Sequence, residues 1–372
     1  MGPRVIVAMS GGVDSSVAAA LLKNDGCEVI GVTFQLHEAG GSGCCSIRDV
    51  KDAFRVTRVL DIPHYVLNLR EEFGRRVVAD FLGEYRKGRT PNPCIRCNEW
   101  IKFDALSRKA KALGAQWIAT GHYARILHDG RTGEPVLARA KDPSKDQSYV
   151  LYVLKREDLS RIYFPLGEFR KDETRRMACG WGLPVANKPD SQEICFVPDN
   201  DYRKFLAGRL PGDAASGPII DITGRILGAH KGIIHYTIGQ RKGLGLSAPE
   251  PLYVLEIVPS RNAVIVGKEE MLYQTEIRAS QVNWLTRPLR QGEALEVEAR
   301  IRHKAPWVRA VIECEEQNFV RILFKEPQRA AAPGQSVVFS RDERILGGGI
   351  IEEAVISSRE QTRPEIPDSP ES

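Results

Sequence analysis

The stretch at residues 5–17 constrains the fold most, because it joins an apolar run to a Ser-Gly-Gly turn and then to a helix start. Residues 5–9 are apolar, mostly β-branched and bounded by glycine, so they predict a buried strand. A helix is expected over residues 16–23. Gly11 and Gly12 let a ligand approach the backbone, and the amides of a helix N-terminus attract an anion. The stretch therefore predicts a phosphate-binding loop.

The side chains of this loop indicate which phosphate group it binds. The Gly-Lys-Ser/Thr ending of the Walker A loop is missing from the sequence here. Ser10, Asp14, Ser15 and Ser16 are present instead. Hydroxyls and amides suit a pyrophosphate, and Asp14 is the candidate ligand for the Mg²⁺ that accompanies it. From these residues alone, an ordinary strand-to-helix turn with Ser and Asp as caps stays open.

The exact string at residues 10–16, Ser-Gly-Gly-Val-Asp-Ser-Ser, favours the first interpretation. It resembles the signature of the PP-loop ATP pyrophosphatases. The resemblance implies an enzyme that splits ATP between the α and β phosphates and adenylates a substrate oxygen.

Strand-like runs alternate with helical patterns from residue 5 to about residue 120, which predicts an α/β fold with a doubly wound parallel sheet. The expected strands are residues 5–9, 28–34, 64–67 and 117–120, and the expected helices are residues 16–23, 48–60, 70–86 and 99–113. Ligands of such sheets bind beyond the carboxyl ends of the strands. The Ser-Gly-Gly loop, Phe34 and Gly121 all follow such ends, so we expect them to share one site.

Composition narrows the class of protein. The 372 residues are 42% hydrophobic and 27% charged, which is typical of a globular chain of two or three domains. No apolar run approaches the roughly 20 residues of a membrane span, and no signal peptide precedes the first strand, so we expect a cytoplasmic protein without membrane contact. Eight scattered cysteines do not fit a secreted disulfide scaffold. The formal net charge of +5 permits nucleic-acid binding without requiring it.

Cys94 and Cys97 form a Cys-x-x-Cys pair with three interpretations: a zinc half-site, a redox disulfide, or two ligands of an iron-sulfur cluster. The sequence has no second Cys-x-x-Cys or His-x-x-His to complete a zinc site, which makes structural zinc the weakest. Asn98 is expected to cap a following helix, whose N-terminus would lower the thiol pKa of Cys97. Cys195, in a short apolar run, reads by itself as a buried structural cysteine.

The remaining sequence predicts further domains. A turn at residues 131–133 predicts a hairpin of residues 123–127 and 135–140, and helices are expected at residues 150–154 and 168–180. After a catalytic domain at residues 1–207, short strands at residues 217–228, 231–238 and 252–266 predict a small β-rich central domain over residues 208–274. Strands at residues 277–285, 294–303, 308–313, 320–324, 336–340 and 346–351 predict a C-terminal β-barrel or sandwich over residues 275–356. The proline-rich, charged tail at residues 357–372 is expected to be disordered.

Seven motifs in order resemble those of the bacterial tRNA-specific 2-thiouridylases. They are residues 10–16, Thr-Pro-Asn-Pro-Cys-x-x-Cys-Asn at 90–98, Gly-His-Tyr-Ala-Arg at 121–125, Lys-Asp-Gln-Ser-Tyr at 145–149, Asp-Ser-Gln-Glu-Ile-Cys-Phe at 190–196, Tyr-Thr-Ile-Gly-Gln-Arg-Lys-Gly-Leu-Gly at 236–245 and Pro-Gly-Gln at 333–335. The resemblance covers nearly the whole chain short of the tail. It implies ATP-dependent replacement of the C2 oxygen of the wobble uridine, U34, by sulfur.

The resemblance also implies roles for particular residues. Cys195 would bear a persulfide, and Cys97 would activate and then resolve it, which reverses the structural interpretation of Cys195. The ATP-binding residues would be Ala8, Met9, Ser10, Gly11, Gly12, Val13, Asp14, Ser15, Phe34 and Gly121. The residues touching tRNA would be Asn92, Pro93 and Cys94 at the flipped target base, His122, Asp146, Gln147 and Ser148 at the anticodon region, and Arg302, His303 and Gln335 from the barrel.

Two departures from the family pattern leave alternatives open. Some members carry aspartate where Cys94 stands, and Cys94, Cys97 and Cys195 could instead hold three corners of a [4Fe-4S] cluster. His303 stands where tyrosine is often found, and either ring can stack on RNA. Adjacent Cys44 and Cys45 have no clear role, since neighbouring side chains diverge.

Other classes of protein remain possible from the sequence. They are a PP-loop amidase or ligase acting on a small molecule, and a non-enzymatic iron-sulfur or RNA-binding module that retains the loop. The resemblance favours neither. It implies ATP and Mg²⁺ as cofactors and tRNA acceptors for Lys, Glu and Gln. A cysteine desulfurase or a sulfur-relay protein would donate the sulfur.

Overall fold

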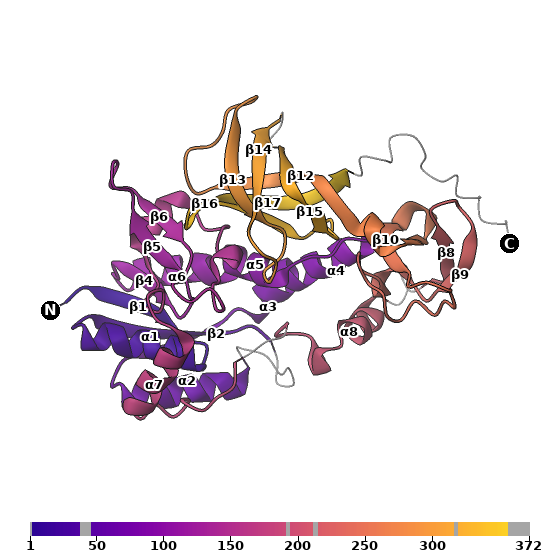
Figure 1. Ribbon diagram of the computed structural model, residues 1–372. Coiled ribbons are helices and arrows are strands. Elements are labelled where there is room, and N and C mark those ends of the chain that lie inside the picture. Colours follow the sequence, from indigo (N-terminus) through magenta and orange to yellow (C-terminus); the bar gives the residue numbers. More distant parts are fainter. Residues whose placement is uncertain (1, 38–45, 191–193, 211–214, 316–318, 356–372) are drawn as a thin grey trace.

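The computed structural model describes residues 2–37, 46–190, 194–210, 215–315 and 319–355. Cys44, Cys45 and the expected tail at residues 357–372 lie outside the described residues. Figure 1 shows a helix-covered sheet at the bottom, a barrel above it, and a smaller β-rich region to the right. None of the helices in the described ranges is long and apolar enough to cross a membrane.

The first sheet is parallel throughout, with strand order β3-β2-β1-β4-β7. Its strands are β1 (Arg4–Ala8), β2 (Glu28–Gln35), β3 (His64–Asn68), β4 (Trp117–Thr120) and β7 (Ile162–Tyr163). Four of them are the predicted strands, shifted by at most one residue at either end. The doubly wound α/β prediction is therefore confirmed, with β7 as an extra edge strand.

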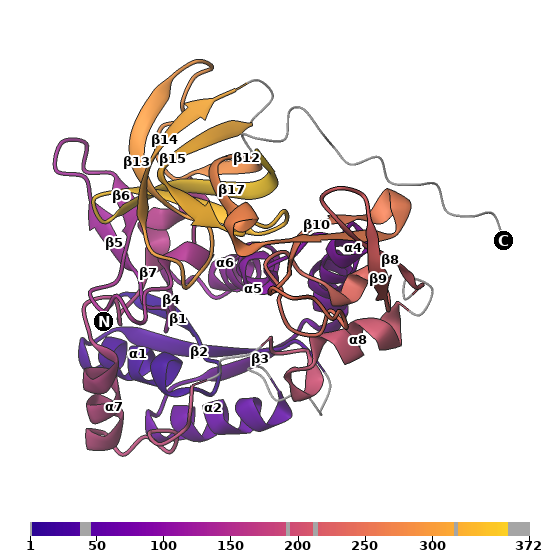
Figure 2. The ribbon, with the colours of Figure 1, turned by 45° about the vertical axis from the view of Figure 1, so that its right-hand side comes forward.

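Helices cover both faces of this sheet, as the alternation predicted. Val5 and Val7 of β1 point to one face and pack in one core with α1 (Val13–Asn24), α2 (Ile47–Val59) and α7 (Lys171–Gly180). Ile6 points to the other face and packs with α3 (Arg70–Phe73), α4 (Ala79–Arg86) and α6 (Phe103–Ala112). In Figures 1 and 2 the first group lies below the strands, and α6 lies above them, toward the barrel.

The helix expected at residues 99–113 begins earlier, which corrects the interpretation of Cys97. The helical run starts at α5 (Pro93–Cys97) and continues through a π-helical turn, Asn98–Lys102, into α6. Asn92 is the cap, because its side chain accepts from the Cys94 N–H at 3.2 Å and Pro93 suits the first turn. Asn98 is buried and donates to the Val150 carbonyl oxygen at 2.9 Å. Cys97 thus lies inside a helical run, so its predicted position just before a helix capped by Asn98 is wrong.

Two other expected elements are also wrong. Residues 150–154 do not form a helix: a single 3-10 turn, Ser148–Val150, precedes irregular backbone whose apolar side chains are buried. Residues 231–238 do not form a strand: Gly232 adopts φ +108° and a 3-10 turn, Ile233–His235, follows. In both places tertiary burial, rather than local periodicity, decides the backbone.

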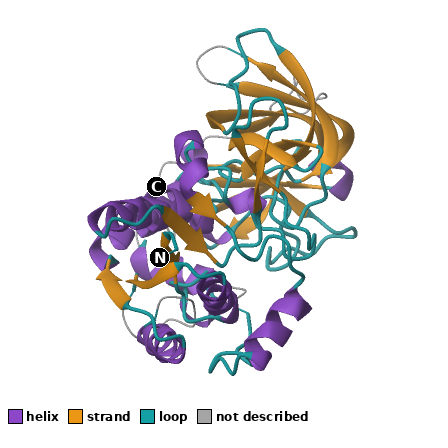
Figure 3. Ribbon diagram, turned by 90° about the vertical axis from the view of Figure 1, so that its left-hand side faces the viewer, coloured by secondary structure: helices purple, strands orange, loops and turns teal. Residues whose placement is uncertain are grey.

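The central region is a four-stranded sheet of order β10-β11-β8-β9. Its strands are β8 (Gly217–Asp221), β9 (Ile226–His230), β10 (Tyr253–Val258) and β11 (Ala263–Gly267), and the helix α8 (Tyr202–Arg209) precedes them in the chain. In Figure 3 the strands of the barrel stand apart from the helix-covered sheet.

The last six strands form a closed antiparallel barrel, which is one of the two predicted architectures, the other being a sandwich. They are β12 (Tyr273–Trp284), β13 (Ala294–Arg300), β14 (Val308–Cys314), β15 (Val320–Arg329), β16 (Ser336–Arg341) and β17 (Arg344–Val355). Pairing of β12 with β17 closes the ring. The predicted hairpin of β5 (Arg125–His128) and β6 (Pro135–Ala138) also forms, and β6 pairs with β17 through Ala138 and Arg344. The catalytic region thereby adds an edge to the barrel sheet.

Candidate functional site

The loop between β1 and α1 is held in shape by its own side chains. The Ser10 N–H donates to Ser15 Oγ at 3.1 Å, and Ser16 Oγ donates to the Gly12 carbonyl oxygen at 2.8 Å. Gly11 adopts φ +68°, and a Cβ there would lie 2.2 Å from the Asp49 carbonyl oxygen, so only glycine fits. The loop is therefore held in its shape by residues of the chain itself.

The first-turn amides of α1 favour the anion-binding interpretation over plain capping. Gly12 is the N-cap residue, and none of the described side chains caps this helix. The alternative that the sequence left open, in which Ser and Asp side chains cap this helix, is therefore wrong. Uncapped amides at a helix N-terminus are a suitable site for a phosphate.

The ends of β2 and β4 meet this loop, as predicted. Ala8 pairs with Val32 in β2 and with Thr120 in β4. A Cβ on Gly121 would lie 2.5 Å from the Ser15 amide nitrogen, so this glycine permits the close approach of β4 to α1. Phe34 is buried at the end of β2. Met9 and Val13 are buried beside the loop and form part of its frame.

Asp14, the predicted magnesium ligand, already has two partners. Its Oδ1 and Oδ2 accept from Lys171 Nζ at 2.7 Å and 2.8 Å, and Tyr123 Oη donates to Oδ1 at 3.0 Å. Burial and the nearby Asp14 carboxylate raise the pKa of Tyr123, which stays protonated as a donor. The carboxylate that the sequence predicts as a magnesium ligand is therefore paired with Lys171 in this structure.

Asp190 is a second carboxylate in this network, and sequence reasoning did not single it out. Its Oδ1 accepts from Lys171 at 2.9 Å and from Arg175 at 2.7 Å, and its Oδ2 accepts from Lys145 at 2.8 Å. Burial disfavours the charged form, but hydrogen bonds from Lys145 and Lys171 outweigh it and lower the pKa of Asp190 to about 2. Asp190 is thus ionised at neutral pH.

Lys188 was also missed, and it fixes the loop from the other side. Its Nζ donates to the Gly11 carbonyl oxygen at 2.9 Å, to Asp49 at 2.8 Å and to Asp52 at 2.7 Å. Lys145 and Asp190 lie in the quoted motifs at residues 145–149 and 190–196, and Lys188 lies just before the second motif. This position was their only signal in the sequence. No pattern in the sequence linked Lys171 to Asp14.

The structure brings Cys97 and Cys195 to the same apolar cluster. Cys97 is 6% exposed within the core on the α6 side of the sheet, and half-buried Cys195 packs against that core. Phe196 anchors the Cys195 segment there, with its ring 5.6 Å from Phe73 and 5.3 Å from Phe81. Phe34, near the end of β2, belongs to the same extended core.

Cys94 lies differently. It is exposed on α5, whereas Cys97 is buried. Within the described ranges, no three His, Cys, Asp or Glu side chains gather closely enough to hold a metal ion. The three thiols therefore lack the arrangement that a cluster site requires in this structure.

Comparison with known proteins assigns the family. Family models match three consecutive segments: a tRNA methyl transferase HUP domain at residues 3–199, a tRNA methyl transferase PRC-barrel domain at residues 203–268 and an aminomethyltransferase β-barrel domain at residues 274–351. The tRNA-specific 2-thiouridylase MnmA of Carboxydothermus hydrogenoformans is 50% identical over 94% of this chain and 97% of its own length. That of Clostridium perfringens is 48% identical over 94% of this chain and 98% of its own. The chain belongs to the tRNA-specific 2-thiouridylase family.

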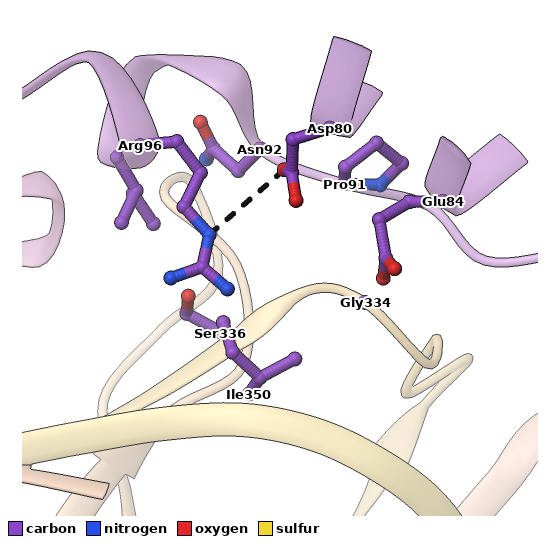
Figure 4. A pocket seen from close by; sticks show the side chains of 9 residues that line it. Asp80, Glu84, Pro91, Asn92, Arg96, Gly334, Ser336 and Ile350 are labelled. Atoms are coloured by element: carbon purple, nitrogen blue, oxygen red, sulfur yellow. Dashed lines mark ion pairs between the residues drawn. The ribbon is translucent and has the colours of Figure 1, made fainter. Parts of the chain in front are cut away.

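The residues that this family resemblance assigned to the target base lie near the barrel. Asn92 lines a small cavity with Asp80, Arg96 and residues of the barrel (Figure 4). Arg96 approaches Asp80 at 3.9 Å across it. With a volume of about 10 Å³, the cavity has room for about one water molecule and none for a uracil ring. Pro93 is buried, so of the three assigned residues the exposed Cys94 is the most accessible to a base.

The thiouridylase residues assigned to the anticodon region are mostly internal. Asp146 and Ser148 are buried, and Ser148 Oγ donates to Asp146 Oδ2 at 2.9 Å. Gln147 Oε1 accepts from the Tyr123 N–H at 2.9 Å. His122 is half-buried and stacks on Phe103 at 6.1 Å. Their side chains shape the loop at residues 145–149, and their contact with tRNA stays a prediction.

Of the barrel residues assigned to tRNA, His303 lies beside that loop. The ring of exposed His303 lies 5.9 Å from the ring of Tyr149. Gln335 Nε2 donates to the Thr90 carbonyl oxygen at 2.9 Å, and Arg302 donates to the Ala330 carbonyl oxygen. In this thiouridylase the barrel therefore contacts the catalytic region through Gln335 and His303, and the contact of these residues with tRNA stays a prediction.

Proposed function

We propose that this chain is an ATP-dependent tRNA-uridine 2-sulfurtransferase that thiolates the wobble uridine, U34. The C2 oxygen of the uridine attacks the α-phosphorus of ATP, and pyrophosphate leaves. Adenylation converts a poor leaving group into AMP. The terminal sulfur of a Cys195 persulfide then attacks C2, and AMP departs with the former C2 oxygen.

Cys97 completes the proposed cycle. Its thiolate attacks Sγ of Cys195, which releases the sulfur on C2 as the thiocarbonyl and leaves a Cys97–Cys195 disulfide. An external thiol must reduce this disulfide before the next turnover. The two cysteines share one apolar cluster, which supports the assignment because a dry environment protects the adenylated base from water.

The observation that carries the proposal is the uncapped nucleotide loop in a chain whose Cys97 and Cys195 both pack on one apolar core. A methyltransferase, as two of the family-model descriptions read, needs neither a pyrophosphate loop nor paired cysteines. A PP-loop amidase or ligase acting on a small molecule needs no terminal barrel. Thiolation uses all three features.

ATP and Mg²⁺ are the proposed cofactors, with Asp14 as the magnesium ligand once it leaves Lys171. A [4Fe-4S] route is the less favoured alternative, because the described cysteines do not converge on one point. Iron and sulfide analysis after anaerobic purification separates the two routes: thiolation by iron-free protein excludes an obligatory cluster.

The proposed partners follow from this chemistry. They are tRNA acceptors for Lys, Glu and Gln, and a cysteine desulfurase or sulfur-relay protein that loads Cys195. The proposed working units are residues 1–207, 208–274 and 275–356, with a tail at residues 357–372. Thiols that must be reduced in each cycle suit the cytoplasm.

Product analysis tests the proposal. Purified protein with ATP, a persulfide donor and U34-containing tRNA is expected to release AMP and pyrophosphate and to form 2-thiouridine. Release of ADP and phosphate would exclude the adenylation step. Turnover of ATP without any dependence on tRNA would favour a small-molecule substrate instead.

A further inference from the structure

Lys188 joins the nucleotide loop to the helix α2. Its Nζ donates to the Gly11 carbonyl oxygen at 2.9 Å, and it pairs with Asp49 at 2.8 Å and with Asp52 at 2.7 Å. The motifs that carry the family resemblance do not include Lys188. One ammonium group therefore holds a peptide of the loop and two carboxylates of α2 at the same time.

The two carboxylates keep Lys188 charged and engaged. The side chains of Asp49 and Asp52 are 11% and 15% exposed, so the ion pairs are partly shielded from water. Burial disfavours the charged form of Lys188, but its hydrogen bonds with Asp49 and Asp52 outweigh burial and raise its pKa. Because α2 already neutralises its charge, Lys188 is suited to hold the loop rather than to bind a phosphate directly.

Asp49, one of the two carboxylate partners, is itself fixed. Its Oδ2 accepts from the Ser46 N–H at 2.9 Å in the capping box at the start of α2. The backbone of Asp49 also lies against the loop, since a Cβ on Gly11 would be 2.2 Å from the Asp49 carbonyl oxygen. Gly11 is therefore held between the backbone of α2 and the Nζ of Lys188.

The backbone of Lys188 is anchored as well. Arg175 of α7 donates to the Lys188 carbonyl oxygen at 3.1 Å and to the Ala186 carbonyl oxygen at 3.3 Å. The Lys188 N–H donates to the carbonyl oxygen of Val185 at 2.9 Å, and Val185 is buried in the core that also contains the apolar side chains of α1. The ammonium group therefore reaches the loop from a backbone that is fixed to the same layer of helices.

The hydrogen bond to the Gly11 carbonyl oxygen also sets the direction of the next amide. In a trans peptide the C=O and the N–H point in opposite directions, so the Gly12 N–H points away from Lys188. Within the described ranges, the amides of residues 12–15 at the N-terminus of α1 have no hydrogen-bond acceptor. Lys188 therefore orients the first of the amides that the proposed pyrophosphate site offers.

We propose that Lys188 is a positioning residue that orients the nucleotide loop for the pyrophosphate part of ATP. The inference rests on the proposed function, in which this loop binds that part of the nucleotide. Lys188 acts through the peptide between Gly11 and Gly12, and its described hydrogen bonds reach neither Phe34 nor Gly121, where the rest of the nucleotide is expected. Loss of Lys188 therefore weakens the binding of ATP and of pyrophosphate and leaves the binding of AMP unchanged.

Calorimetric titration of Lys188→Met with ATP, with inorganic pyrophosphate and with AMP, each in the presence of Mg²⁺, tests the inference. ATP and pyrophosphate are expected to bind about 10-fold more weakly than to wild type, because that is a typical effect of losing a hydrogen bond from a charged group. AMP should bind as it does to wild type. Lys188→Arg keeps the charge and is expected to recover part of the ATP affinity. Equal losses for ATP and AMP, or an unchanged ATP affinity, would overturn the inference.

The matched control is Arg55→Met. Arg55 pairs with the same Asp52, at 3.6 Å, but its side chain is 69% exposed, and none of its interactions with described residues reaches the loop. All three ligands should bind to this variant as they do to wild type. A loss of ATP affinity as large as that of Lys188→Met would show that any cation near α2 suffices, which would overturn the inference.

A double variant keeps the test decisive if Lys188→Met fails to fold. Lys188→Met leaves Asp49 and Asp52 without the cation between them, and adding Asp52→Asn removes one of these two charges. The Gly11 carbonyl oxygen still lacks its donor, so the same selective loss of ATP and pyrophosphate supports the inference, and wild-type ATP affinity contradicts it. Failure of the proposed function is distinguishable, because these titrations need neither tRNA nor a sulfur donor, whereas wild type would then form no 2-thiouridine.

Discussion

The nucleotide loop and the cysteine pair are built in opposite ways. The loop is local: hydrogen bonds among Ser10, Gly12, Ser15 and Ser16 hold a shape that one glycine makes possible. The cysteine pair is not local, since Cys97 and Cys195 come from distant segments and both pack on one apolar core. Local sequence can therefore specify the activating part of the site, whereas tertiary packing must assemble the sulfur-transferring part.

The largest effect is expected from replacing either site cysteine, which removes sulfur transfer and leaves the nucleotide loop unchanged. Cys195→Ser and Cys97→Ser should each reduce 2-thiouridine formation by at least about 10³-fold, because each removes a nucleophile. ATP binding, measured by calorimetry, should survive. Cys179→Ser is the control, since Cys179 is exposed on α7. Thiolation retained in either site variant would remove the persulfide assignment.

The second-largest effect is expected from replacing Asp14, which alters the nucleotide loop and leaves the cysteines unchanged. Asp14→Ala should lower tRNA-dependent pyrophosphate release about 10²–10³-fold, as expected for loss of a group that stabilises transferring charge. Binding of tRNA, measured by filter retention, should remain. Asp25→Ala, an exposed carboxylate at the other end of α1, should behave as wild type. Normal pyrophosphate release by Asp14→Ala would contradict the role of the loop.

A third prediction tests whether glycine at position 11 is needed to hold the shape of the nucleotide loop. Gly11→Ala combines a positive φ with a clash against the Asp49 backbone, whereas Gly26→Ala has φ +80° and open space around it. Thermal unfolding should show both variants destabilised by about 1–3 kcal/mol from backbone strain. Gly11→Ala should lose more stability than Gly26→Ala and should also lose ATP affinity. Equal effects in the two variants would show that the close approach is unimportant.

The smallest effect concerns acid stability. The pKa of Asp190 in the folded protein, about 2, lies below the ordinary value of a carboxyl group. Its ion pairs therefore add stability that is present above the ordinary value and is lost as pH falls toward about 2. Between these values the melting temperature of wild type should fall more steeply than that of Asp190→Asn. Parallel curves would contradict the ion-pair account.

The contrast between local hydrogen bonding and long-range packing explains which features could be predicted from the sequence and which could not. The parallel sheet, the hairpin and the six barrel strands follow from alternation and turn residues, and the loop follows from one short string. Asn98 was misread as a cap because the better cap, Asn92 before Pro93, starts the helix earlier. Lys171, Lys188 and Asp190 could not be predicted, since long-range ion pairs leave no periodicity in the chain.

The central claim is that ATP activates the uridine and that the sulfur comes from Cys195. Protein loaded with ³⁵S by a cysteine desulfurase and freed of donor tests it in a single turnover with U34-containing tRNA. The account predicts that the label leaves Cys195 and appears in 2-thiouridine only when ATP is added, with one AMP for each sulfur transferred. Transfer of label without ATP, or labelled 2-thiouridine from the Cys195→Ser variant, would contradict it.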